Sequence, residues 1–208
     1  MRVSDYATGC WTKTGEQFSR RTLLRLLRSG HTQWNKWRRS LPDLQWYSVS
    51  GKIFWLPGFV IRLPHCDLRR LNLSNYELVG IDFTNSSFTK SKFRDVDFHW
   101  LLGKPIQPRT VLDECCFRST DFTGASLSYT SAIGCDFSHA DLNGTEIVGS
   151  NLSDSIFFKT FLAAKFDNTN VTNADFDGAY LMASAFINVD LRQGAPHRWL
   201  TRISAAHA

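Results

Sequence analysis

The chain has 208 residues, of which 43% are hydrophobic and 21% charged, and its formal net charge at neutral pH is +5. This composition is typical of a globular protein with one domain, or with one domain and a cap. The most apolar stretch, residues 53–61, contains Pro57 and Gly58 and is far shorter than the roughly 20 residues that a membrane span needs. The N-terminus lacks the apolar core of a secretory signal peptide. We therefore expect a cytoplasmic protein with no membrane association.

The charges are distributed unevenly along the chain. Residues 1–65 hold 11 Lys and Arg against 3 Asp and Glu, whereas residues 110–191 hold 3 against 11. Such an asymmetry bears on binding partners more than on the fold. The sequence thus predicts a basic N-terminal head on an acidic body.

The head begins with two predicted short helices between Gln17 and Arg39. In the first helix, leucines at positions 23, 24, 26 and 27 form an apolar face and arginines form the polar face. Gly30 suits the C-terminus of this helix, Thr32 is the expected N-cap of the second, and Pro42 ends the second. Residues 45–65 are predicted to form a hairpin or an irregular strand pair that turns near residues 50–51.

A five-residue period occupies most of the remaining chain. From Leu68 to Leu191 every fifth residue, here called the centre, is apolar and usually Leu or Phe. Nine extra residues interrupt the period after Phe98, and one residue is missing after Leu162. An amphipathic helix repeats about every 3.6 residues and a half-buried strand about every 2, so neither explains this pattern. The period indicates an internal repeat.

Two further positions of the repeat are regular. The residue two places before the centre, here called the small position, is Ala, Ser, Thr or Cys in sixteen of the seventeen repeats from Leu112 onward. The residue directly before the centre, here called the Asx position, is often Asp or Asn, as in Ala140-Asp141-Leu142. A large and a small side chain in each repeat can fill a narrow interior at close-packed density.

These residues resemble the pentapeptide-repeat family, whose consensus is a small residue, Asp or Asn, Leu or Phe, and two polar residues. The resemblance covers residues 66–193. It implies an all-β solenoid, a right-handed quadrilateral β-helix of about six coils, in which the centre and the small position point inward. The string from Trp34 to Arg38 resembles the helical lead-in that precedes many such rods. We therefore expect residues 1–65 to form an N-terminal helical and hairpin cap, and residues 194–208 to form a C-terminal cap or tail.

The nine extra residues fall within 99–109 and are predicted to leave the solenoid as a loop, because Pro105 and Pro108 prevent regular ladder pairing. Insertions in repeat proteins usually form loops, often on a binding face. The large apolar side chains of this loop either fold back on the rod or form a partner-binding tip. They are Trp100, Leu101, Leu102 and Ile106.

No catalytic, cofactor or metal motif is recognisable in the sequence. It contains no P-loop, GxGxxG, HExxH or GxSxG string, and its five cysteines lack the spacing of a metal finger. Cys66, Cys115 and Cys135 fall at small positions, where we interpret them as small hydrophobes, whereas Cys116 falls at an outward position. A filled β-helix also offers no pocket for acid–base chemistry. We therefore expect a protein that is not an enzyme and holds no cofactor and no metal.

The leading hypothesis is a non-catalytic scaffold that presents its flat faces and its loop to a protein partner. An alternative follows from the resemblance, because some family members protect DNA gyrase from quinolones or toxins with an acidic rod that resembles duplex DNA. The basic head does not fit that alternative. Its candidate residues are Asp121, Asp136, Asp141 and Asp175.

A second alternative is nucleic-acid binding through the basic head, which is the less favoured partner class. Its candidate residues are Arg21, Arg25, Arg28 and Arg38. The competing interpretation of the head is that it seals the first coil, since an open β-helix end exposes unpaired backbone groups. The sequence names neither the partner nor the oligomeric state.

Overall fold

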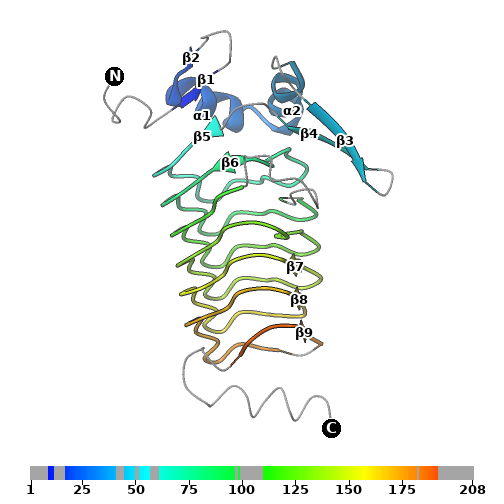
Figure 1. Cartoon of the computed structure of the whole chain (residues 1–208). Helices are drawn as coiled ribbons and strands as arrows, with labels where there is room; N and C mark the ends of the chain where they lie inside the picture. Colours follow the sequence, from blue (N-terminus) through cyan, green and yellow to red (C-terminus); the bar gives the residue numbers. More distant parts are fainter. Residues whose placement is uncertain are drawn as a thin grey trace, which may run out of the picture.

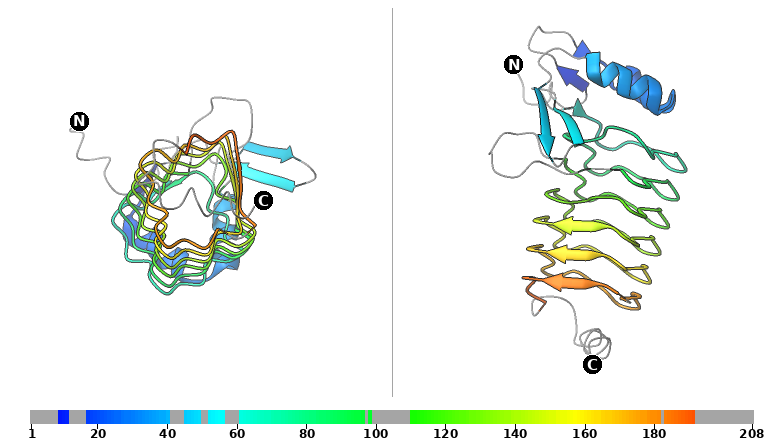
Figure 2. Two further views of the ribbon diagram at one scale, coloured as in Figure 1. Left: turned by 90° about the horizontal axis from the view of Figure 1, so that it is seen from below. Right: turned by 90° about the vertical axis from the view of Figure 1, so that its right-hand side faces the viewer.

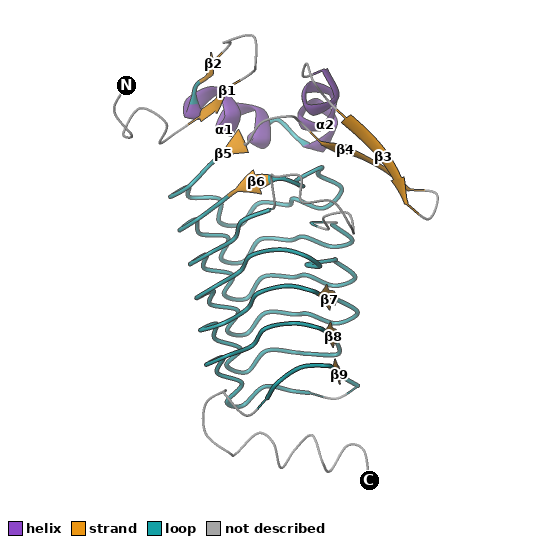
Figure 3. Cartoon of the chain, viewed as in Figure 1, coloured by secondary structure: helices purple, strands orange, loops and turns teal. Residues whose placement is uncertain are grey.

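The structure is a computed structural model, and it describes residues 9–11, 17–40, 45–49, 52–56, 61–96, 98, 110–181 and 183–191. It shows a stack of coils with a small helical head at its N-terminal end (Figure 1). The coils form a right-handed β-helix solenoid. Most of the solenoid consists of turns and isolated bridges, with few short strands (Figure 3). The helices are α1 (Arg20–Arg28) and α2 (His31–Ser40), and the strands are β1 (Gly9–Trp11), β2 (Gln17–Phe18), β3 (Gln45–Val49), β4 (Lys52–Leu56), β5 (Ile61–Arg62), β6 (Ile81–Asp82), β7 (Glu146–Val148), β8 (Lys165–Asp167) and β9 (Ala185–Ile187).

The head contains the two helices and the hairpin that the sequence predicts. Ser19 caps α1 by accepting a hydrogen bond from the Thr22 backbone, 3.2 Å away. Gly30, at a φ of +105°, separates the helices, and its carbonyl accepts the first backbone bond of α2 from Trp34. The prediction that Thr32 caps α2 is therefore wrong, because the helix begins at His31 and includes Thr32. β3 and β4 pair antiparallel and extend sideways from the stack (Figure 2).

The coils stack with a fixed register. Parallel bridges join residues twenty apart, as in Asp67 with Ser87 and Asp121 with Asp141, so one turn of the solenoid takes four repeats. Across the insertion the separation rises to 29, and across the four-residue step it falls to 19, as in Phe161 with Tyr180. The coils thus stay paired in parallel on both sides of each irregularity. β7, β8 and β9 stack in parallel along one side of the solenoid.

The centres fill the interior. Every described centre from Leu63 to Phe176 is at most 2% exposed. Five phenylalanines form one stacked row along the axis, with successive ring centroids 5.2, 5.1, 5.1 and 4.7 Å apart; they are Phe88, Phe117, Phe137, Phe157 and Phe176. In the last coil Leu181, Phe186 and Leu191 pack against the core but stay half-buried.

Ser and Thr side chains at small positions form hydrogen bonds with the backbone of the neighbouring coil. The Ser86 hydroxyl donates to the Leu63 carbonyl at 2.9 Å, and the Thr160 hydroxyl donates to the Phe137 carbonyl at 2.8 Å. In each case the acceptor is a centre 23 residues earlier in the chain. Buried hydroxyls need such partners. The preference for Ser and Thr at this position therefore follows from the stacking of the coils.

A left-handed residue turns every described corner but one. The residue two places after a centre has a positive φ in nearly every described repeat, as in Asn85 (59°), His139 (60°) and Asn173 (57°). Between Leu162 and Phe166, both described, no residue has a positive φ. The four-residue step is thus a corner that lacks its left-handed residue.

Candidate functional site

Side chains of the head bond the exposed backbone of the first coil. The end of a β-helix presents carbonyl groups that the next coil would otherwise pair. Here α1 and α2 supply the donors. The bonds run from Arg20 to the His65 carbonyl, from Arg28 to that of Asp67 (3.0 Å), from the Trp34 indole to that of Glu77 (3.0 Å), from Asn35 to that of Asn75 (2.9 Å) and from Arg38 to that of Val79 (2.8 Å).

These bonds correct part of the predicted basic patch. Arg38 is 1% exposed and holds the Val79 carbonyl, so it does not lie on an outer surface. Arg28 is exposed but bonds the first coil. The error arises because sequence periodicity does not show which arginines a neighbouring coil will cover. Arg21 and Arg25 are exposed as expected.

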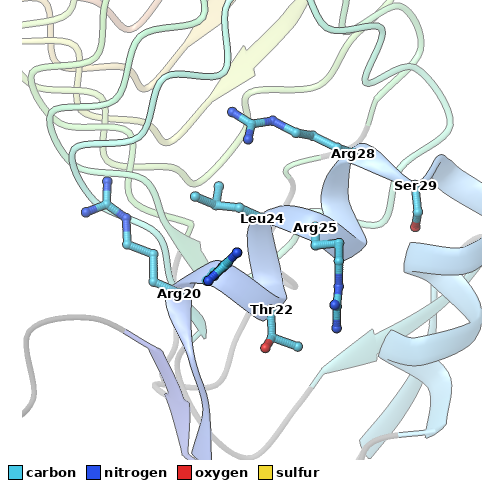
Figure 4. A pocket seen from close by; sticks show the side chains of 7 residues that line it. Arg20, Thr22, Leu24, Arg25, Arg28 and Ser29 are labelled. Carbon is cyan, nitrogen blue, oxygen red and sulfur yellow. The ribbon is translucent and has the colours of Figure 1, made fainter.

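An open pocket lies along α1. It is lined by Arg20, Arg21, Thr22, Leu24, Arg25, Arg28 and Ser29. In Figure 4 the side chains of Arg20, Leu24 and Arg28 extend from one side of α1 and that of Arg25 from another. Because Arg20 and Arg28 bond the first coil, few of the lining charges are free for a ligand.

The four aspartates predicted as partner-binding residues all shape corners of the solenoid. Each lies at an Asx position, and its Oδ1 accepts a hydrogen bond from the backbone N–H two residues later, at 2.8 to 3.1 Å. Asn151 makes the same bond to Ser153 at 3.2 Å. Such local bonds favour Asp and Asn in turns. The frequency of aspartate in these repeats is therefore explained in part by the fold.

Two of the four carboxylates are also paired with arginines. Arg94 pairs with Asp121, and Arg118 lies 3.0 Å from Asp136. Burial opposes ionisation of both carboxyl groups, but hydrogen bonds from the turn and from the arginines lower the pKa of each below its ordinary value. Among the ion pairs of the described residues, none involves Asp141 or Asp175.

The acidic residues do not form a continuous stripe. In one row of stacked Asx positions Ile156 separates Asp136 from Asp175. In the next row Asp121 and Asp141 are followed by Phe161 and Tyr180. In the C-terminal half of the solenoid, apolar residues thus occupy positions in both acidic rows.

These apolar residues form a surface feature that the sequence analysis missed. Ile156, Phe161 and Tyr180 are 41%, 49% and 51% exposed, and the Phe161 and Tyr180 rings stack at 4.9 Å. Phe158, half-buried, lies at the corner between the two rows. We call Ile156, Phe158, Phe161 and Tyr180 the aromatic patch. The available signal was the presence of Ile, Phe and Tyr at Asx positions, where the consensus is polar.

The remaining candidate residues lie either outside the described residues or in the interior of the solenoid. Trp100, Leu101, Leu102 and Ile106 lie outside the described residues, as does the predicted C-terminal cap. Cys66, Cys115 and Cys135 are buried as expected, and burial raises the pKa of the last two thiols. The described part of the chain contains no group of three or more His, Cys, Asp or Glu that would suit a metal ion. Neither described helix is long and apolar enough to cross a membrane.

The chain is similar to known proteins that contain the same repeat. The family model described as pentapeptide repeats matches in eight copies, over residues 66–100, 120–157 and 161–193. Similar solved structures include Rfr23 from the cyanobacterium Cyanothece 51142, with 13% identity, 65% of this chain and 91% of that chain covered, and a TM-score of 0.37. HetL from Nostoc sp. strain PCC 7120, described as involved in heterocyst differentiation regulation, is 17% identical, with 64% and 86% covered and a TM-score of 0.29. QnrB1, described as a plasmid-mediated fluoroquinolone resistance protein, is 15% identical, with 70% and 98% covered and a TM-score of 0.29. No curated protein matches the chain.

Proposed function

Because the chain belongs to the pentapeptide repeat family, whose model matches about half of its residues, we propose that it is a non-catalytic scaffold that binds a protein partner on the outer faces of its solenoid. We take the solenoid to be quadrilateral, with about six coils between an N-terminal cap (1–65) and a C-terminal tail (194–208), and with the loop at 99–109 as a second contact. The twenty-residue bridge spacing supports four faces.

One observation carries the proposal. Large apolar side chains are exposed to solvent on the outer surface of the solenoid, at Asx positions that elsewhere often carry Asp or Asn. Exposed apolar clusters with a polar rim mark interaction sites on monomeric proteins. The interior offers no comparable site, since the described centres and small positions fill it. Binding on a face is therefore the activity that this surface supports best.

Affinity capture tests the proposal. The tagged full-length chain, cross-linked in a lysate of its source cells, is expected to retain one protein at a constant ratio, and that protein after purification is expected to bind the chain directly in calorimetry. A second bait that lacks residues 99–109 reports whether the loop contributes. Absence of direct binding by every captured protein would contradict a scaffold role.

Interaction with DNA gyrase or another topoisomerase is the alternative that the acidic rows favour. Residues 110–191 carry 11 acidic against 3 basic residues, and no described ion pair neutralises Asp141 or Asp175. Opposite surface potentials would steer such association, and salt would screen it. The observed arginine pairs at Asp121 and Asp136 reduce the free negative charge.

A supercoiling assay with gyrase, run with and without a quinolone, decides this alternative. Replacement of Asp121, Asp136, Asp141 and Asp175 by Lys removes both the charge and the corner bonds, so the matched control is replacement of all four by Asn, which retains the corner bond seen in Asn151. If the acidic rows mimic DNA, both variants lose the effect on gyrase. The Asn variant gives up the arginine pairs of Asp121 and Asp136 but keeps the corner bonds, so the Lys variant is expected to lose more stability. No effect of the wild-type chain at a large excess over gyrase would exclude the alternative.

Nucleic-acid binding by the head is less well supported, because Arg28 and Arg38 bond the first coil and leave Arg21 and Arg25 on the surface. A gel-shift titration at low salt tests it, since phosphate contacts give affinity that falls steeply with salt. Replacement of Arg21 and Arg25 by Ala is expected to abolish any shift that the head causes. No shift of duplex or single-stranded DNA by the wild-type chain would discard this function.

A further inference from the structure

The aromatic patch surrounds one corner in the C-terminal half of the solenoid. Ile156 and Phe161 lie at the Asx positions of consecutive repeats, and Tyr180 lies directly beyond Phe161 in the next coil. Phe158 lies at the corner between them, where its ring is 5.8 Å from the His139 ring. The Phe161 and Tyr180 rings stack at 4.9 Å, and Ile156 and Phe158 lie on the preceding face and at the corner before them.

Nothing in the fold requires apolar residues at these positions. Asp or Asn at an Asx position bonds the corner backbone, and an apolar side chain gives up that bond. Contacts between neighbouring coils do not require aromatic rings either, because in another row Asn170 donates to Asn151 at 2.9 Å. Ile156, Phe161 and Tyr180 thus lose a local hydrogen bond and leave apolar area in water. Such residues are typical of a surface that a partner covers.

The rim of the patch is predominantly negative. Asp136 and Asp175 lie on either side of Ile156 in their row, and Asp141 precedes Phe161 in the other. Asp177 is exposed beside Asp175, and no described ion pair involves Asp141, Asp175 or Asp177. The nearby cations are Arg118, which pairs with Asp136, and Lys159, whose amino group lies 5.0 Å from the centre of the Phe158 ring. A complementary partner surface would carry positive charges around an apolar centre.

We infer that the aromatic patch docks a segment of another protein in which lysines or arginines flank one apolar anchor. This inference rests on the proposed scaffold function and names the face and the partner chemistry. Aromatic residues at the centre of an interface supply most of its affinity, whereas charges at the rim guide association and register. The Phe161–Tyr180 stack is the centre of the contact, and Asp141 and Asp175 are its rim.

Fluorescence anisotropy with three labelled peptides of equal length tests the inference. The first peptide has lysines around a central tryptophan, the second replaces the tryptophan by serine, and the third replaces the lysines by glutamate. The full-length chain is expected to bind the first peptide at least about tenfold more tightly than either other peptide. Its affinity is expected to fall as salt rises, because the rim contacts are exposed.

Two variants of the chain localise the binding. Replacement of Phe161 and Tyr180 by Asn introduces the residue that Asn151 and Asn170 show at the same repeat position, so folding is retained. The matched control is Ile187→Thr, which removes another exposed apolar side chain (42%) from β9. The Asn variant is expected to bind the first peptide at least about tenfold more weakly, and the control to bind as wild type.

Equal binding of the three peptides would overturn the inference, and so would equal binding of the first peptide by the Asn variant and wild type. A wild-type oligomer that becomes a monomer in the Asn variant would also overturn it, because the patch would then bind a second copy of this chain. Its failure is distinguishable from failure of the scaffold function. A protein that the capture experiment identifies, and that binds wild type and the Asn variant alike, leaves the scaffold in place and places its contact elsewhere.

Discussion

Replacement of Phe137 by Ala is the sharpest test of the interior. Phe137 is fully buried at the middle of the stacked phenylalanine row, with the Phe117 and Phe157 rings each 5.1 Å away and nearly parallel to it. Truncation of a buried Phe to Ala costs about 3–5 kcal/mol. Each aromatic pair contributes a further ~0.5–1.5 kcal/mol beyond the buried area. We therefore expect a loss near the upper end, about 4–5 kcal/mol.

Urea unfolding followed by circular dichroism measures this loss, with native-state hydrogen exchange to locate it. Because each coil contacts mainly its neighbours, the coils around Phe137 should lose protection before the distant ones. The control is Phe137→Leu, which keeps most of the side-chain volume and should cost roughly 1–2 kcal/mol. A loss below about 1 kcal/mol for Phe137→Ala would show that the row is not close-packed, and would refute the reasoning.

Two further predictions concern the corners. Gly149→Ala should lower the melting temperature more than Gly144→Ala, although both residues have a positive φ (61° and 68°). An added Cβ would lie 2.5 Å from the Tyr129 ring at Gly149, but 3.7 Å from its nearest neighbour at Gly144. Equal melting temperatures of the two variants would contradict the coil register. Asp136→Asn should destabilise the protein near neutral pH and lose this effect in acid. Although burial opposes ionisation, hydrogen bonds from the turn and from Arg118 hold the folded pKa of Asp136 below the ordinary Asp value of 3.8. The stability from its ionised form is therefore fully present above that value and disappears as the pH falls through the folded pKa. Urea unfolding of wild type and the Asp136→Asn variant, at pH values above and below 3.8, measures the difference in their free energies of unfolding. A difference that stays constant with pH would exclude the Arg118 pair as its cause.

The solenoid can be predicted from the sequence alone. The centres at every fifth residue and the small positions before them define an interior that only a coil of pentapeptides can fill, and the structure buries them at those positions. The sequence also shows where the period breaks, after Phe98 and after Leu162, and the bridge separations of 29 and 19 follow directly. These features are local, because each repeat contains its own large and small residue and therefore the residues that specify its own turn.

Which residues lie on the surface depends on contacts between the coils. Arg38 is a conspicuous basic residue in the sequence, but the first coil buries it against the Val79 carbonyl. Arg94 neutralises Asp121 from the preceding coil, 27 residues away in the chain. Phe161 and Tyr180 become neighbours only because one missing residue shifts the coil separation from 20 to 19. Contacts between residues a full coil apart depend on the stacking register, which no single repeat encodes, and the surface available to a partner is built from those contacts.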